Sequence, residues 1–173
     1  MQENHEKYMG YALQEAEKAL AAGEFPVGCV LIHDGDIVAA GGRINSGLGG
    51  NEFDHAEIVA LRSLIDTAAD LDFSRVVVYS TLEPCLMCYT TLILNGFRTI
   101  VFGYEDVMGG GSGLELARLP SLYTSMQVQV IPGVSRGACL ELFQRFFKDE
   151  KNDYWRDSLL SQYTLEQHNE DKG

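Results

Sequence analysis

Two short motifs, thirty residues apart, constrain how this chain can fold. His55-Ala56-Glu57 begins one segment with apolar residues at helical spacing, and Pro84-Cys85-Leu86-Met87-Cys88 begins another. Cysteine and histidine are preferred ligands of zinc, and a C-x-x-C pair can point two thiolates at one ion from the first turn of a helix. The fold is therefore expected to bring the first turns of two helices together.

The residues around the cysteines suit a metal site at a helix start. Pro84 is tolerated there because its missing N–H group would have no partner in any case. The positive end of the helix dipole favours ionised thiols. With His55 from the other helix, the protein supplies three ligands and leaves a fourth position for water, which is the arrangement of a catalytic zinc site. The sequence thus predicts zinc bound by His55, Cys85 and Cys88.

Glu57 is the candidate catalytic residue. Positions i and i+2 do not share a helical face, so Glu57 is poorly placed to bind the ion beside His55. It can instead reach the water in the fourth position. A carboxylate there takes a proton from the water and passes it to a leaving group.

Other readings of these motifs stay open. A C-x-x-C pair alone could be a redox pair, and a structural zinc site would need a fourth protein ligand, for which Cys29, Cys139 and His33 are candidates. Each of these three lies in an apolar segment or beside a turn, which favours a role in the core. A non-catalytic, zinc-stabilised binding module predicts that replacing Glu57 leaves function intact.

Composition narrows the class of protein and of partner. The 173 residues suit one domain, with no apolar run long enough to span a bilayer and no signal pattern at the N-terminus. Four cysteines are too few for a disulfide framework, so a cytoplasmic protein is expected. The net charge of -12 repels polyanions on average, and Lys and Arg form no cluster. Composition therefore favours a small substrate over nucleic acid.

Hydrophobic periodicity and turn residues predict the order of the elements. Helices are expected over residues 9–22, 55–69, 85–95, 136–147 and 154–163, and strands over 27–33, 37–40, 75–80, 99–102 and 127–131. This order predicts an α/β fold with a mixed sheet of about five strands between helical layers. One domain is expected over residues 1–165, followed by a disordered tail over 166–173.

On these motifs the chain resembles the cytidine deaminase-like superfamily over nearly its whole length. F-P-V-G at 25–28, H-A-E at 55–57, T-L-E-P-C-L-M-C at 81–88 and V-F-G at 101–103 look most like bacterial tRNA-adenosine deaminases and small zinc-dependent cytosine deaminases. The resemblance implies a three-layer α/β/α sandwich and one zinc per subunit, with Glu57 as the proton shuttle. It also implies a homodimer or larger assembly. The implied reaction is hydrolytic replacement of a ring amino group by oxygen, with release of ammonia.

The resemblance also implies residues that bind the substrate. Asn45 matches the pocket asparagine of the family after a one-residue shift, although a turn residue in a glycine-rich loop is the alternative. Pocket-lining backbone would come from Val27, Gly28 and Ala56.

The C-terminal residues bear on the choice of base. Residues 148–173 carry four basic and seven acidic side chains, a net charge of -3, where bacterial tRNA-editing relatives commonly have a basic helix. The stretch D-Y-W-R-D at 153–157 resembles the C-terminal segment of free-base cytosine deaminases. Tyr154 or Trp155 would then cover the base and Asp157 would accept from its exocyclic amine. A packed tryptophan beside a solvated aspartate is the alternative.

The sequence therefore favours a deaminase of a free nucleobase or nucleoside, cytosine-like or guanine-like. A tRNA-specific adenosine deaminase, which converts adenosine to inosine, is the alternative. The core motifs support this alternative, and the acidic charge of the chain disfavours it.

Overall fold

A five-stranded mixed sheet forms the centre of the protein. The computed structural model describes residues 4–47, 49–67 and 70–168. The strands follow the order β2-β1-β3-β4-β5 across the sheet, and β1 pairs antiparallel with both β2 and β3, whereas β3–β4 and β4–β5 are parallel. Their bounds are β1 Gly28–His33, β2 Asp36–Gly42, β3 Val76–Leu82, β4 Thr99–Tyr104 and β5 Gln129–Ile131. The predicted mixed sheet of about five strands is confirmed.

Local sequence explains the central strands and the hairpin. β1 and β3 are almost continuous apolar runs, as expected for strands that are covered on both faces. Asp34 and Gly35 join β1 to β2 with φ angles of 50° and 92°. A hairpin turn of two residues with positive φ matches the twist of the strands, and Asp-Gly is a preferred pair for it.

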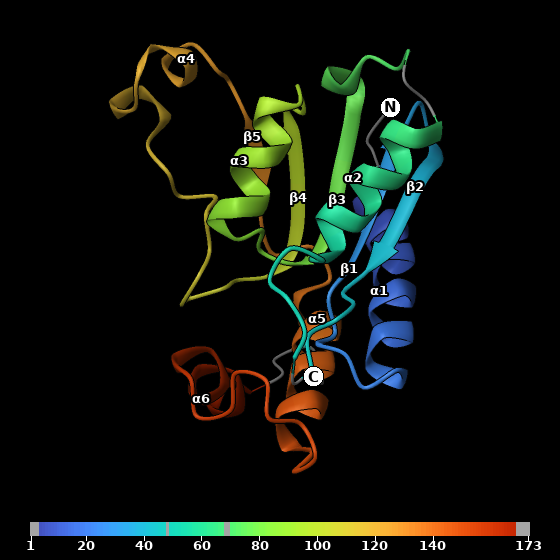
Figure 1. Cartoon of the computed structure of the whole chain (residues 1–173), viewed down its shortest axis with the longest axis vertical. Coiled ribbons are helices and arrows are strands. Elements are labelled where there is room, and N and C mark those ends of the chain that lie inside the picture. Colours follow the sequence, from blue (N-terminus) through green and yellow to red (C-terminus); the bar gives the residue numbers. More distant parts are fainter. Residues whose placement is uncertain (1–3, 48, 68–69, 169–173) are drawn as a thin grey trace.

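Helices cover both faces of the sheet, which confirms the three-layer α/β/α architecture. Figure 1 shows α2 and α3 on one face and α1 on the other. α1 packs on β1 and β3 and touches α5, which contacts β4, while α2 packs on β1 and β2 and touches α3. The helices are α1 His5–Ala21, α2 Ala56–Thr67, α3 Leu86–Leu94, α4 Ser121–Thr124, α5 Arg136–Lys148 and α6 Leu159–Glu166. Among the described residues, none of the helices has the length and apolarity needed to cross a bilayer.

The loop at the carboxyl end of β3 leads directly into α3, and α2 begins beside it. Ligands of open α/β sheets bind outside the carboxyl ends of strands. This arrangement brings the beginnings of α2 and α3 together, as the two sequence motifs predict.

The C-terminal segment differs from the expected helix over 154–163, because the helix begins only at Leu159. Trp155 and Asp157 have φ angles of 56° and 59°, which an α-helix cannot contain. Two turns precede the helix, closed by N–H groups of Arg156 and Ser158, and the Ser158 hydroxyl then caps α6. The apolar spacing of this segment did not reveal these turns.

The predicted tail over 166–173 needs a partial correction. Glu166 is the last residue of α6, and Gln167 is held on α5 by hydrogen bonds from Arg136 and Gln144. Residues 169–173, together with residues 68–69 of the expected helix 55–69, lie outside the described part of the chain.

Candidate active site

His55, Cys85 and Cys88 meet at the beginnings of two helices. His55 directly precedes α2, Cys85 is the N-cap of α3, and Cys88 lies in the first turn of α3. His55 Nδ1 is 3.6 Å from Cys85 Sγ and 3.5 Å from Cys88 Sγ, and the three ligand atoms lie within 4.8 Å of one another. Tetrahedral zinc bonds of ordinary length place nitrogen and sulfur ligands about 3.6 Å apart. The residues therefore fit a zinc ion.

The two thiols form an unequal pair. Hydrogen bonds donated to its sulfur by Cys88 and by His55 lower the pKa of Cys85 to about 4 despite its burial. The thiolate of Cys85 and then burial raise the pKa of Cys88 far above its usual range. Zinc binds thiolates, so a cation that binds here displaces the proton that remains on the pair.

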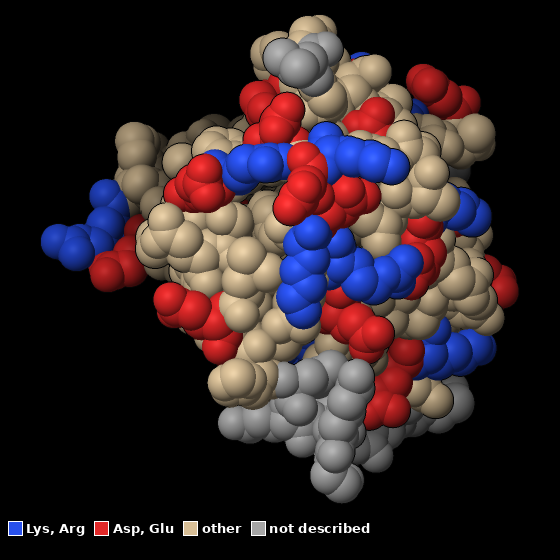
Figure 2. All heavy atoms as spheres, turned by 90° about the horizontal axis from the view of Figure 1, so that it is seen from below, with Lys and Arg blue, Asp and Glu red and all other residues tan. Residues whose placement is uncertain are grey.

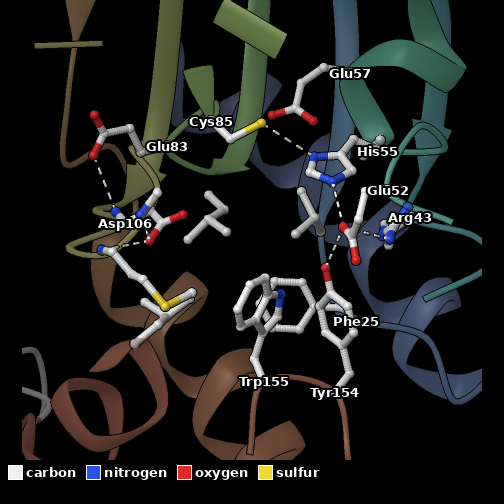
Figure 3. A pocket seen from close by; sticks show the side chains of 16 residues that line it. Phe25, Arg43, Glu52, His55, Glu57, Glu83, Cys85, Asp106, Tyr154 and Trp155 are labelled. Atoms are coloured by element: carbon white, nitrogen blue, oxygen red, sulfur yellow. Dashed lines mark hydrogen bonds and ion pairs between the residues drawn. The ribbon is translucent and has the colours of Figure 1, made fainter. Parts of the chain in front are cut away.

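Glu57 lies beside the ligands without belonging to them. Its side chain, in the first turn of α2, is 3% exposed and points toward Cys85 and His55 (Figure 3). Ser80 Oγ donates to its Oε1 at 3.3 Å. Burial, and then the charge of Cys85, raise the pKa of Glu57 above its usual value. A carboxyl group with a raised pKa is suited to accept a proton and give it back near neutral pH.

A cavity of about 200 Å³ lies next to His55 and Glu57. Two aromatic side chains of the C-terminal segment, Tyr154 and Trp155, close it on one side (Figure 3). A cavity of about 150 Å³ can hold benzene, so this one accommodates a heterocyclic base. The lining comprises Phe25, Val27, Arg43, Glu52, His55, Ala56, Glu57, Leu82, Glu83, Cys85, Asp106, Met108, Gly109, Tyr154, Trp155 and Leu160.

Glu52 connects a metal ligand to the rest of the pocket, and sequence reasoning missed it. Its Oε2 lies 3.3 Å from His55 Nε2, accepts from the Tyr154 hydroxyl at 2.9 Å and pairs with Arg43 Nη2 at 3.3 Å. Burial alone would raise the pKa of Glu52, but the hydrogen bonds from Tyr154 and His55 lower it. An acceptor on the second ring nitrogen leaves His55 Nδ1 free to bind metal. The only signal in the sequence was an acid three residues before the histidine.

Replacing Glu52 by alanine should therefore weaken zinc binding. Loss of a carboxylate partner of a ligating histidine typically lowers metal affinity about 10- to 100-fold. Competition with a chromophoric chelator measures the change. Tyr154→Phe is the matched control, because it removes another hydrogen bond to Glu52 but leaves the His55 contact. Equal zinc affinity in wild type and Glu52→Ala would exclude this role.

Two further acids, Glu83 and Asp106, hold the glycine-rich loop that borders the pocket. Glu83 accepts from the backbone N–H groups of Asp106 and Ser112, and Asp106 accepts from those of Met108 and Gly109. Burial raises the pKa of Asp106. The loop was visible in the sequence, but the hydrogen bonds that bring it to the pocket span over twenty residues.

Four of the predicted substrate-binding residues lie in the pocket lining. Val27 and Ala56 contribute near the metal ligands, and Tyr154 and Trp155 come from the C-terminal segment of the same chain.

The other three predicted residues lie outside the lining. Asn45 is exposed in the loop between β2 and α2, with a φ angle of 57°, and its side-chain amide donates to Asp54. Asp157 is exposed and also has positive φ. Gly28 faces α1, where an added Cβ would lie 2.1 Å from the carbonyl oxygen of Ala12. The sequence analysis matched Asn45 to the pocket asparagine of the family after a one-residue shift. In the structure, Arg43 lines the pocket and Asn45 does not.

Gly28→Ala should consequently destabilise the fold rather than alter specificity. The added methyl group meets rigid helix backbone, so we expect a loss of about 1–3 kcal/mol or more in the free energy of unfolding, measured in urea. Gly10→Ala is the matched control: it lies in α1 with open space around it, and should gain roughly 0.5–1 kcal/mol. A stable Gly28→Ala variant with altered substrate preference would contradict this placement.

Known proteins are similar to this chain in sequence and in fold. The chain is 32% identical to the tRNA-specific adenosine deaminase of Haemophilus influenzae over 86% of each chain. It is 31% identical to the tRNA-specific adenosine deaminase of Bacillus subtilis, over 83% of this chain and 89% of the relative. A solved structure from work on A-to-I editing by tRNA:A34 deaminases at the wobble position of transfer RNA superposes with a TM-score of 0.68. This structure is 29% identical, over 79% of this chain and 98% of its own.

These relatives overturn the preference for a free nucleobase or nucleoside that charge and the C-terminal residues suggested. Both curated relatives carry the name of the alternative, tRNA-specific adenosine deaminase. The acidic composition was misleading because net charge reports an average over the surface and says nothing of the pocket.

The prediction of a zinc-dependent hydrolase that acts on a C–N bond is confirmed, because the family model and the deaminase relatives agree with it. The family described as the cytidine and deoxycytidylate deaminase zinc-binding region matches residues 2–104, which include all three candidate ligands and Glu57. The chain therefore belongs to the cytidine and deoxycytidylate deaminase zinc-binding family.

Proposed function

We propose that this protein is a tRNA-specific adenosine deaminase, which hydrolyses adenosine in tRNA to inosine and releases ammonia. The observation that carries the proposal is the identity of 31–32% with tRNA-specific adenosine deaminases over 83–86% of the chain. The chain also covers most of these relatives' length, so it has room for the same catalytic domain.

The size of the cavity supports a substrate of which only the base enters the pocket. A volume of about 200 Å³ suits one heterocycle, with little space left for ribose and phosphate. Enzymes that act on a base within a polynucleotide take this base out of the stack and bind it between aromatic or apolar side chains. Phe25, Tyr154 and Trp155 supply aromatic rings for such contacts.

The proposed chemistry assigns a role to each polar group at the cavity. Bound zinc, held by His55, Cys85 and Cys88, would supply Lewis-acid activation of the attacking water. Glu57 takes a proton from this water and delivers it to the departing amino group. Ser80 Oγ orients the Glu57 carboxylate, and the buried position of Glu57 keeps bulk water from competing for the proton.

The surface does not offer a broad basic area for RNA on the face seen in Figure 2. Lysine and arginine side chains there alternate with aspartate and glutamate. With a net charge of -12, binding should depend on the pocket and on a few local contacts more than on long-range attraction.

The direct test is deamination of a tRNA anticodon stem-loop with adenosine at the wobble position, followed by nucleoside mass spectrometry. We expect inosine at this position only, and no ammonia from free cytosine, guanine or adenine. The stem-loop with the wobble adenosine replaced by guanosine is the substrate control. Turnover of a free base without turnover of the stem-loop would overturn the proposal.

Assembly and location are further parts of the proposal. Leu86 and Leu94 are 53% and 49% exposed and lie eight residues apart on α3, which suits contact with a second copy. Light scattering should therefore report a homodimer, and Leu94→Glu should shift it toward monomer. The cytoplasmic location stays a prediction, which cell fractionation would test.

A further inference from the structure

Arg43 places a buried guanidinium group in the pocket wall, and two of its nitrogen atoms have no hydrogen-bond partner among the described residues. It follows directly on β2, and its side chain is 2% exposed. Nη2 donates to the carbonyl oxygen of Asn51 at 2.7 Å and pairs with Glu52 at 3.3 Å. Nε and Nη1 are buried and have no hydrogen-bond partner among the described residues. Buried donors without acceptors are rare and costly, so this pair requires an explanation.

The surroundings connect Arg43 to the reaction centre. The guanidinium lies 5.7 Å from the centre of the Tyr154 ring, and the Tyr154 hydroxyl donates to the same Glu52 that contacts His55 (Figure 3). Arg43, Tyr154 and His55 therefore meet at one carboxylate. A substitution of Arg43 can alter the positions of both His55 and Tyr154, because both contact Glu52.

We propose that Arg43 determines specificity by donating from Nε and Nη1 to an uncharged ring-nitrogen acceptor on the edge of the substrate base. Arg43 and Glu57 line the same cavity, so a base that accepts from Arg43 turns its amino-bearing carbon toward Glu57. This inference rests on the proposed deamination of adenosine, whose base carries ring-nitrogen acceptors besides the amino group.

The charge of the pocket decides between a neutral acceptor and an anion. An arginine fork also suits carboxylate and phosphate. However, the cavity is lined by the carboxyl groups of Glu52, Glu57, Glu83 and Asp106, against the cation of Arg43. A phosphate placed here would meet like charges in a confined space, whereas an uncharged heterocycle would not. The observations therefore favour the base edge over its phosphate.

The test combines variants of Arg43 with substrates that lack one ring nitrogen. Wild type, Arg43→Met and Arg43→Lys, all zinc-loaded, are assayed on stem-loops whose wobble adenosine is unmodified, 7-deaza or 3-deaza. Binding of free purine riboside and of its deaza analogues is measured in parallel by calorimetry. Arg98→Met is the matched control, because the half-buried side chain of Arg98 donates to the carbonyl groups of Ile93 and Phe97 and is not part of the pocket lining.

We expect one deaza substitution to lower kcat/KM of wild type about 10- to 100-fold, the range for a hydrogen bond to a charged group. Arg43→Met should show a similar loss on the unmodified substrate and little further loss on that analogue. Arg43→Lys keeps the charge but not the paired donors, so it should recover only part of the activity. Arg98→Met should lose stability without changing the ratio between substrates.

The inference would be overturned if every deaza substitution lowered kcat/KM of Arg43→Met by the same factor as kcat/KM of wild type. A uniform loss on all substrates that follows the zinc content or the melting temperature would also overturn it, since this indicates a structural role. The calorimetric arm separates this question from the proposed function. If the stem-loop is not turned over but purine riboside shows the coupling to Arg43, the tRNA assignment fails and the role of Arg43 stands.

Discussion

Glu57→Gln should abolish most turnover while leaving zinc in place. The amide cannot accept the proton of the attacking water, and proton transfer by a positioned side chain contributes about 10²- to 10⁴-fold. We therefore expect kcat to fall by that factor. Glutamine keeps the shape and the oxygen that Ser80 contacts, so the fold should be unchanged. Inosine formation on the stem-loop and zinc content by mass spectrometry measure the two effects.

The outcome also separates catalysis from simple binding. Glu141→Gln, which makes the same change at an exposed position of α5, is the control and should leave kcat within about twofold. Loss of zinc from Glu57→Gln would mean that Glu57 holds the metal rather than the proton. Full activity in Glu57→Gln would favour the non-catalytic binding module.

Cys88→Ala should remove the metal and, with it, all measurable activity. The variant leaves only His55 and Cys85 near the ion, and two ligands do not hold zinc against chelators. Zinc per chain should fall from about one to near zero. The melting temperature should fall as well, because metal that binds only the folded state stabilises it.

The control for this variant is another buried free cysteine. Cys139 is fully buried on α5, packs against Gly103 and does not belong to the cluster of His55, Cys85 and Cys88. Cys139→Ala should keep its zinc and lose only modest stability, on the order of 1 kcal/mol. A Cys88→Ala variant that retains zinc at the wild-type level would show that the metal lies elsewhere. The role of Cys85 and His55 would then need revision too.

The candidate zinc site and the position of Glu57 beside it could be predicted from the sequence alone. Each motif lies within one short stretch of chain. Cys85 and Cys88 are spaced for one helical turn at the start of α3, and His55 and Glu57 lie together at the start of α2. Local spacing and helix starts are properties that short stretches of chain carry. The central strands were equally readable, since apolar runs bounded by turn residues keep their character in any context.

The side chains that form the wall of the pocket could not be predicted from the sequence, because tertiary packing brings them together. Arg43 and Glu52 lie in the loop between β2 and α2, and Asp106 lies in the loop after β4. Their contacts join residues up to 102 positions apart, as between Glu52 and Tyr154. The same holds for the segment before α6, where left-handed residues replace the expected helix. Hydrophobic periodicity does not report backbone turns, and net charge does not report where charges gather. Metal chemistry is encoded in short motifs, whereas the shape and polarity that select a base arise only when distant loops pack together.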